Sequence, residues 1–102
     1  MTIRVERPEQ DSGPAIVLDQ HFDFESVGSF RQCYETLVNT EEGVVAIDFR
    51  NTRFIDSSAL GMLINARSFF EEKNIDVVLI NPCESVRKIF NISRFDKKFE
   101  IR

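Results

Sequence analysis

Residues 44–61 of the chain read VVAIDFRNTRFIDSSALG. The first six of them, from Val44 to Phe49, form a nearly unbroken apolar run, which predicts a central strand covered on both faces. Apolar residues then recur at helical spacing over residues 59–73, so we expect an amphipathic helix there. The segment therefore predicts a strand, a loop and a helix, which is the repeating unit of α/β proteins.

The sequence on both sides of this segment predicts the remaining strands. Apolar and β-branched residues alternate or cluster over residues 2–7, 15–18 and 76–80, and residues 99–101 suit a small edge strand. Residues 8–14 contain Pro, Asp, Ser and Gly, so they predict a turn between the first two strands.

Helical spacing occurs in two more places. A first helix is marked by Val27, Phe30, Tyr34, Leu37 and Val38, with Asp23 and Ser26 upstream as available caps. A short last helix is marked by Val86, Ile89 and Phe90. Together the elements predict one α/β domain over residues 1–102, with a mixed sheet of four to five strands and crossover helices.

Composition and charge exclude several functions. The chain has 102 residues, 13 basic and 17 acidic side chains, and a net charge of −4. This charge argues against binding to nucleic acid or an anionic membrane, which requires clustered Lys and Arg. No apolar run approaches the roughly 18 residues that span a bilayer. Charges within the first seven residues break any signal peptide, so we expect a cytoplasmic protein.

The inventory of catalytic and metal-binding residues is also poor. Cys33 and Cys83 lie 50 positions apart without a CxxC motif, and His21 is the only histidine. These spacings are not those of zinc or thioredoxin-type sites, and one histidine makes a Ser-His-Asp triad improbable. We expect the two cysteines to be small buried apolar residues and not a disulfide, and we expect no metal or cofactor and no enzymatic activity of the chain itself.

The helix over residues 59–73 has a mixed apolar surface. At 100° per residue one arc gathers the side chains that should face the sheet: Ala59, Met62, Leu63, Ala66 and Phe70. Leu60 and Ile64 lie beside this arc. Two interpretations remain open for them, a wide core face or a partly exposed strip that docks a partner.

Asp56, Ser57 and Ser58 precede this helix, and each is a residue type that caps helices. Capping needs only one of them, so at least one hydroxyl is free. A serine without a base is an unlikely nucleophile. It suits a phosphate acceptor, because free N–H groups and the helix dipole favour an added anion there. The residues themselves leave capping and phosphorylation as alternatives.

Residues 44–49 followed by residues 54–61 resemble the hallmark stretch of STAS domains, specifically the bacterial anti-anti-sigma factors, or anti-sigma factor antagonists. Residues 22–26 are similar to the family's segment that opens the first helix. Residues 81–90 are similar to its last crossover into the final helix. The similarity therefore extends over nearly the whole chain and implies a STAS-like fold.

The resemblance implies a partner switch. The unmodified domain binds a kinase-type anti-sigma factor of the GHKL class and thereby frees a sigma factor. That kinase phosphorylates the serine directly after the Asp, which is Ser57 here, and a PP2C-type phosphatase removes the phosphate. Partner contacts are expected at Asp23, Asp56, Ser58, Leu60 and Ile64.

Two residues depart from the family pattern. Ala59 stands where the family most often has Gly, and His21-Phe22 replaces a Gly-Glu pair before Asp23. Both changes leave the acceptor in place but alter the rim that a partner meets. One alternative is a STAS scaffold subunit of a transporter or signalling complex, without phosphorylation. Another is a small enzyme or nucleotide-binding module, which the lack of a glycine-rich phosphate loop disfavours.

Overall fold

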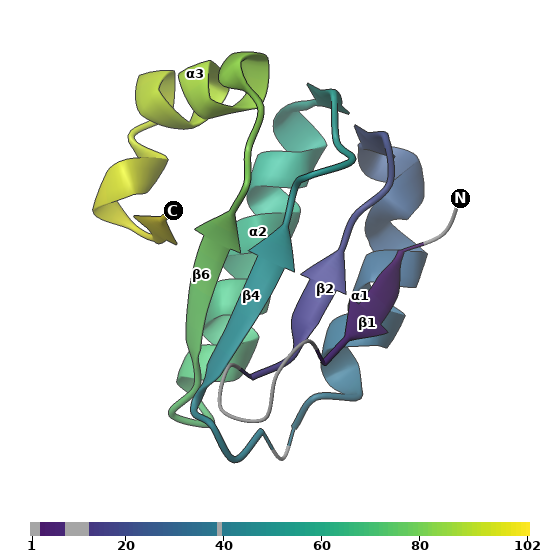
Figure 1. The fold of residues 1–102 in the computed structure, drawn as a ribbon, viewed down its shortest axis with the longest axis vertical. Helices are drawn as coiled ribbons and strands as arrows, with labels where there is room; N and C mark the ends of the chain where they lie inside the picture. The colour runs from purple at the N-terminus through teal and green to yellow at the C-terminus, as the bar shows by residue number, and fades with distance from the viewer. Residues whose placement is uncertain (1–2, 8–12, 39) are drawn as a thin grey trace.

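The computed structural model describes residues 3–7, 13–38 and 40–102 (Figure 1). The strands are β1 (Arg4–Glu6), β2 (Ala15–Val17), β3 (His21–Phe22), β4 (Val44–Asp48), β5 (Phe54–Ile55), β6 (Asp76–Ile80) and β7 (Glu100–Ile101). The helices are α1 (Val27–Glu35), α2 (Ser57–Glu71) and α3 (Glu84–Ile92), with short 3-10 helices η1 (Phe24–Ser26) and η2 (Phe95–Lys97).

Five strands form a mixed sheet in the order β1-β2-β4-β6-β7. β1 is antiparallel to β2, and the other neighbouring strands are parallel. The chain steps in one direction from β2 to β4 to β6, so right-handed crossovers put α1 and α2 on the same face, as Figure 1 shows. The predicted α/β class, mixed five-stranded sheet and crossover helices are confirmed.

Aromatic rings fill much of the core. Phe49, which directly follows β4, makes edge-to-face contacts with Phe22 and Phe90, at centroid separations of 6.3 and 5.2 Å. Phe22 in turn contacts Phe30 of α1 at 4.9 Å. All four side chains are at most 1% exposed. Phe49 therefore links α3 to the β3 strand and to α1 at one end of the sheet.

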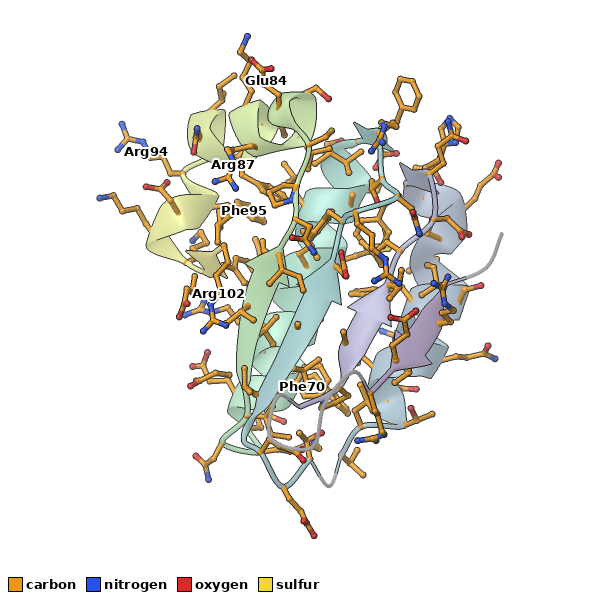
Figure 2. All side chains as sticks on the ribbon, in the orientation of Figure 1. Phe70, Glu84, Arg87, Arg94, Phe95 and Arg102 are labelled. Atoms are coloured by element: carbon orange, nitrogen blue, oxygen red, sulfur yellow. The ribbon has the colours of Figure 1, made fainter. Side chains whose placement is uncertain are left out.

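The expected inner face of α2 is confirmed, since Ala59, Met62, Leu63, Ala66 and Phe70 (labelled in Figure 2) are all buried. The helix itself begins and ends two residues earlier than the predicted range of 59–73. The reason lies at its start, where Asp56 is the N-cap, so Ser57 is already helical.

The prediction that β4 is covered on both faces is wrong, because α1 and α2 lie on one face only. The residue that faces the other way at the end of β4 is Asp48, which is 3% exposed. The Asn81 side chain donates a hydrogen bond to Asp48, and the Arg50 guanidinium lies 3.6 Å from Asp48 and 2.7 Å from Glu6. Polar side chains, not a helix, therefore cover this part of the sheet.

The first helix also differs from its prediction. α1 ends at Glu35, before Leu37 and Val38, and the Thr36 hydroxyl donates to the Cys33 carbonyl at 2.7 Å at this end. Leu37 is nevertheless buried. Leu37 lies just after the helix but is buried like a residue of its inner face, so its position in the sequence made the predicted helix too long.

Part of the predicted turn over residues 8–14 lies outside the described residues, as does Thr2 of the first predicted strand. Among residues 3–7, 13–38 and 40–102, no helix has both the length and the apolar character needed to cross a membrane.

Gly13 and Gly28 provide a matched test of the backbone. Gly13 has φ +76°, and a Cβ there would lie 2.4 Å from the Val44 carbonyl oxygen, whereas a Cβ at Gly28 of α1 meets nothing within 4 Å. We expect Gly13→Ala to lower the free energy of unfolding by at least about 1–2 kcal/mol. Gly28→Ala should raise it by about 0.5–1 kcal/mol. Urea denaturation followed by circular dichroism measures both, and equal effects would contradict this account.

Candidate functional site

The candidate site lies at the edge of the sheet where the parallel strands β2, β4 and β6 end. In Figure 1 the loops that follow these strands, the start of α2 and the start of α3 all lie at this end of the molecule. In open α/β sheets, this carboxyl edge is the usual place for a binding site. The Asp56-Ser57-Ser58 segment is at its middle, because β4 lies between β2 and β6.

Asp56 is the side-chain cap of α2. Its Oδ1 accepts a hydrogen bond from the Ala59 N–H at 2.9 Å, and its Oδ2 accepts one from the Phe24 N–H at 3.3 Å. One carboxylate therefore satisfies an amide at the start of α2 and an amide at the start of η1, 32 residues away. The capping role that the sequence left open among three residues belongs to Asp56.

Ser57 and Ser58 are left for other roles. Ser57 is the first residue of α2 and is exposed, whereas Ser58 is half-buried. Ala59, which stands at the family's glycine position, is fully buried, so its methyl group packs in the core and does not crowd the surface. The structure therefore leaves the Ser57 hydroxyl accessible at a helix N-terminus.

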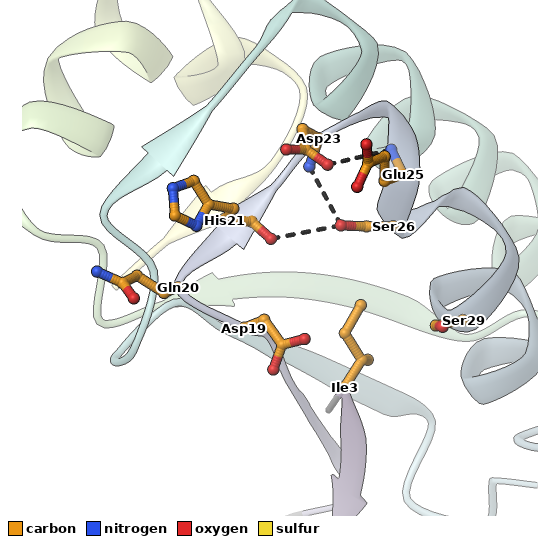
Figure 3. A pocket seen from close by; sticks show the side chains of 8 residues that line it. All are labelled: Ile3, Asp19, Gln20, His21, Asp23, Glu25, Ser26 and Ser29. Atoms are coloured by element: carbon orange, nitrogen blue, oxygen red, sulfur yellow. Dashed lines mark hydrogen bonds between the residues drawn. The ribbon is translucent and has the colours of Figure 1, made fainter. Parts of the chain in front are cut away.

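Asp23 closes a capping box at η1, as Figure 3 shows. Its carboxylate accepts from the Glu25 N–H at 3.1 Å, and its own N–H donates to the Ser26 oxygen at 3.2 Å. The Ser26 hydroxyl donates onward to the His21 carbonyl at 3.3 Å. Of the two caps expected for the first helix, Asp23 thus caps the preceding η1, and Ser26 makes no side-chain cap on α1.

A second, two-stranded sheet joins the two loops of the site, and the sequence analysis missed it. β3 and β5 pair in parallel, with His21 opposite Phe54. The Thr52 hydroxyl donates to the Asp19 carbonyl at 2.8 Å, and the Arg53 and Phe54 N–H groups both donate to the Gln20 carbonyl. Two-residue strands give no periodic signal, so only the pairing itself reveals them.

A concavity of about 620 Å³ lies next to the β3–β5 pair (Figure 3). Its lining residues are Ile3, Asp19, Gln20, His21, Asp23, Glu25, Ser26 and Ser29. Within the described part of the chain, no three His, Cys, Asp or Glu side chains are grouped as metal ligands.

The two apolar residues predicted to flank the inner face of α2 differ in burial. Leu60 is half-buried and packs against the core cluster, which fits a wide core face. Ile64 is 36% exposed. It lies on the side of α2 that also carries Ser57, two turns further along the helix. Asp23 and Asp56 are brought together through η1, whereas Leu60 and Ile64 extend the site along α2.

A model of the STAS domain family matches residues 4–102, so the chain belongs to the STAS domain family. A STAS-domain containing protein of Pseudomonas aeruginosa (strain UCBPP-PA14) is 40% identical over 86 residues, which are 84% of either chain.

Solved structures share the fold. The anti-sigma factor antagonist SpoIIAA in its unphosphorylated form matches with a TM-score of 0.69 and 20% identity, over 99% of this chain and 87% of that one. Phosphorylated Bacillus SpoIIAA matches with a TM-score of 0.69 and 21% identity, over 99% and 91%. A candidate anti-sigma factor antagonist from Thermotoga maritima reaches a TM-score of 0.76 at 17% identity, over 97% and 84%. These likenesses show the fold alone.

The two cysteines are free thiols, as expected, but both are half-buried and not buried as predicted. Their pKa values are shifted in opposite directions. The hydrogen bond with Ser85 lowers the pKa of the Cys83 thiol, and the Val86 N–H at the start of α3 adds to the effect. Burial raises the pKa of the Cys33 thiol. Because the thiolate is the reactive form, iodoacetamide should modify Cys83 at a lower pH than Cys33. Mass spectrometry across a pH series measures the pH at which each cysteine becomes modified. Ser85→Ala should reduce the difference between the two pH values, because it removes the hydrogen bond that lowers the pKa of Cys83.

Substitution of Asp56 tests the hydrogen bonds that connect the start of α2 to the start of η1. Asp56→Ala removes the acceptor for both the Ala59 and the Phe24 amides, so the free energy of unfolding should fall by about 1–2 kcal/mol. Asp56→Asn keeps one oxygen for the Ala59 cap but not the acceptor for the Phe24 amide, so it should lose about half as much. Urea denaturation compares the two variants, and equal losses would mean that the charge, not the cap, matters.

Proposed function

We propose that the protein is an anti-sigma factor antagonist. In this proposal the unphosphorylated chain binds a kinase-type anti-sigma factor of the GHKL class in the cytoplasm and so frees a sigma factor. Phosphorylation of Ser57 ends the binding, and a PP2C-type phosphatase restores it. The single observation that carries the proposal is the exposed Ser57 hydroxyl at the head of α2, next to an Asp56 that already caps the helix.

The chain is then a protein substrate and not an enzyme. The bound kinase joins the Ser57 oxygen to the γ-phosphorus of its ATP, and ADP and the hydroxyl proton leave. The phosphate adds about −1.5 to −2 charge at neutral pH. Free N–H groups in the first turn of α2 and the positive end of the helix dipole stabilise this charge. The fold therefore accepts the modification without rearranging.

The binding surface of the kinase, in contrast, is no longer complementary to the chain once Ser57 carries a phosphate. A kinase that reaches Ser57 must place its nucleotide's γ-phosphate against the hydroxyl, so a phosphate already attached occupies that place. Burying its charge without a counterion costs several kcal/mol. A loss of about 4 kcal/mol corresponds to nearly a thousandfold in affinity. A local change of charge and bulk is thus sufficient to switch binding off.

The other predicted contact residues take supporting roles. Asp56 and Asp23 accept hydrogen bonds from amides at the two helix starts, so they keep the docking surface in shape, and Asp23 also borders that surface. Ser58, Leu60 and Ile64 would contact the partner directly beside and below Ser57. The alternative, a STAS scaffold subunit of a transporter or signalling complex, has no need of an accessible hydroxyl at this position.

Substitutions at Ser57 test the proposal. A Ser57→Ala bait identifies the cognate GHKL-type kinase by mass spectrometry, and the purified kinase is then used for titrations. Ser57→Ala should bind it with unchanged affinity in the presence of ATP, because no phosphate can be added. Ser57→Asp should bind at least a hundredfold more weakly. Ser68→Asp adds the same charge three turns along α2 and should bind like the parent chain.

Mass spectrometry after incubation with kinase and ATP locates the phosphate. Modification of Ser57, absent in Ser57→Ala, is expected. Phosphate on Ser58 alone would move the acceptor by one residue. Recovery of a transporter component in place of a kinase would favour the scaffold function.

A further inference from the structure

Large hydrophobic side chains are exposed around the head of α2. In the described part of the chain the six exposed ones are Phe24 (70%), Val27 (43%), Val38 (40%), Phe54 (58%), Ile64 (36%) and Ile92 (77%). Of the four others besides Val38 and Ile92, Phe24 belongs to η1, Phe54 to β5 and Val27 to the first turn of α1, and Ile64 lies two turns into α2. Gathered apolar exposure of this kind marks an interaction surface more reliably than scattered single residues do.

The backbones of the two phenylalanines are connected to the segment that carries Ser57. Phe54 is two residues before Asp56, and the Phe24 N–H donates to the Asp56 carboxylate that caps α2. The backbones that carry the two rings are therefore fixed relative to the acceptor. The sequence analysis did not single out either ring as a partner contact.

The Phe54 ring is also held in place before any partner arrives. It stacks on the His21 ring with centroids 4.8 Å apart and an interplanar angle of 13°. The β3–β5 pairing sets these two residues opposite each other. A ring that is already ordered loses little conformational entropy on binding, which is a property of good anchor residues.

Gly61 adds an independent observation on α2. It lies one turn after Ser57 and one turn before Ile64, and a Cβ at this position would meet nothing within 4 Å. Glycine inside a helix costs roughly 0.5–1 kcal/mol relative to alanine. Packing within the described chain gives no reason for this glycine. The close approach of another protein to the helix backbone would give one.

The charges around this surface are mainly negative. Asp23, Glu25 and Asp56 stand beside the two rings, and among the described residues none of the three forms a salt bridge within 4.0 Å. The nearby Arg53 guanidinium donates to carbonyls of its own loop, those of Arg50 and Thr52. A complementary partner surface is therefore apolar at its centre and basic at its rim.

We propose that Phe24 and Phe54 are the anchors of the docking surface, and that they fill an apolar cleft, rimmed by Lys or Arg, on the kinase-type anti-sigma factor. This inference rests on the proposed function and names the residues that determine its specificity. The basic rim meets Asp23 and Glu25 at the periphery, whereas a phosphate on Ser57 lies at the centre, where the nucleotide of the kinase must fit. The acidic side chains at the periphery therefore favour binding, whereas the phosphate at the centre prevents it.

Alanine substitutions at equally exposed positions test the anchors. Phe24→Ala and Phe54→Ala should each weaken binding of the purified GHKL-type kinase about tenfold or more, as truncated interface anchors do. Ile92→Ala is the matched control, because Ile92 is the most exposed of the six and lies on α3. It should change affinity less than twofold. Circular dichroism verifies that all three variants are folded.

Charge reversal tests the chemistry of the rim. Glu25→Lys should weaken binding and reduce its dependence on salt concentration, whereas Glu72→Lys, at the far end of α2, should change neither.

Unchanged affinity of both phenylalanine variants, with Ser57 still phosphorylated, would overturn the inference and leave the proposed function standing. If the parent chain binds no such kinase, both are overturned. A dimer of the parent chain in sedimentation velocity that Phe24→Ala abolishes would assign the surface to a second copy and overturn the kinase as its occupant.

Discussion

The arrangement of the site depends on the two hydrogen bonds of the Asp56 carboxylate. One oxygen caps α2 through the Ala59 amide, and the other holds the Phe24 amide at the start of η1. Each bond alone is an ordinary cap, worth on the order of 1 kcal/mol. Together they fix the beginning of the second crossover helix to the loop that leads into the first. The backbone of Phe24 is thereby connected to the residue that precedes Ser57.

This constraint also explains why the proposed phosphorylation of Ser57 would require no conformational change elsewhere in the molecule. The loops on either side are held by the β3–β5 pairing and by the Thr52 bond to the Asp19 carbonyl. Phe22 and Phe49 close the core directly beneath them. In the proposed switch, a phosphate on Ser57 would be stabilised by free amides and by the helix dipole. Its effect would then be confined to the proposed docking surface, which is apolar with acidic neighbours.

Local patterns predicted the larger elements well. The apolar run of β4, the helical arc of α2 and the caps at its start each follow from residues close together in the chain. Where the prediction was wrong, a contact distant in sequence had intervened. Leu37 is buried by tertiary packing and not by helix α1, so its spacing extended the predicted helix too far. The polar cover over Asp48 comes from the nearby Arg50, which also pairs with Glu6 of β1, and from Asn81 after β6, and no periodicity encodes these contacts.

The sequence by itself determined the α/β order of elements and the inner face of α2. It also determined that a helix cap and at least one further hydroxyl lie in the loop between β4 and α2. These features depend on residues within one or two turns or strands, so composition and spacing specify them. Only the tertiary structure decided that Asp56 is the cap, that Ser57 is exposed, and that Phe24 and Phe54 are exposed as well. The physical reason is that the β3–β5 pairing and the Asp56–Phe24 bond join segments about 32 residues apart, and their formation requires the whole sheet edge to assemble.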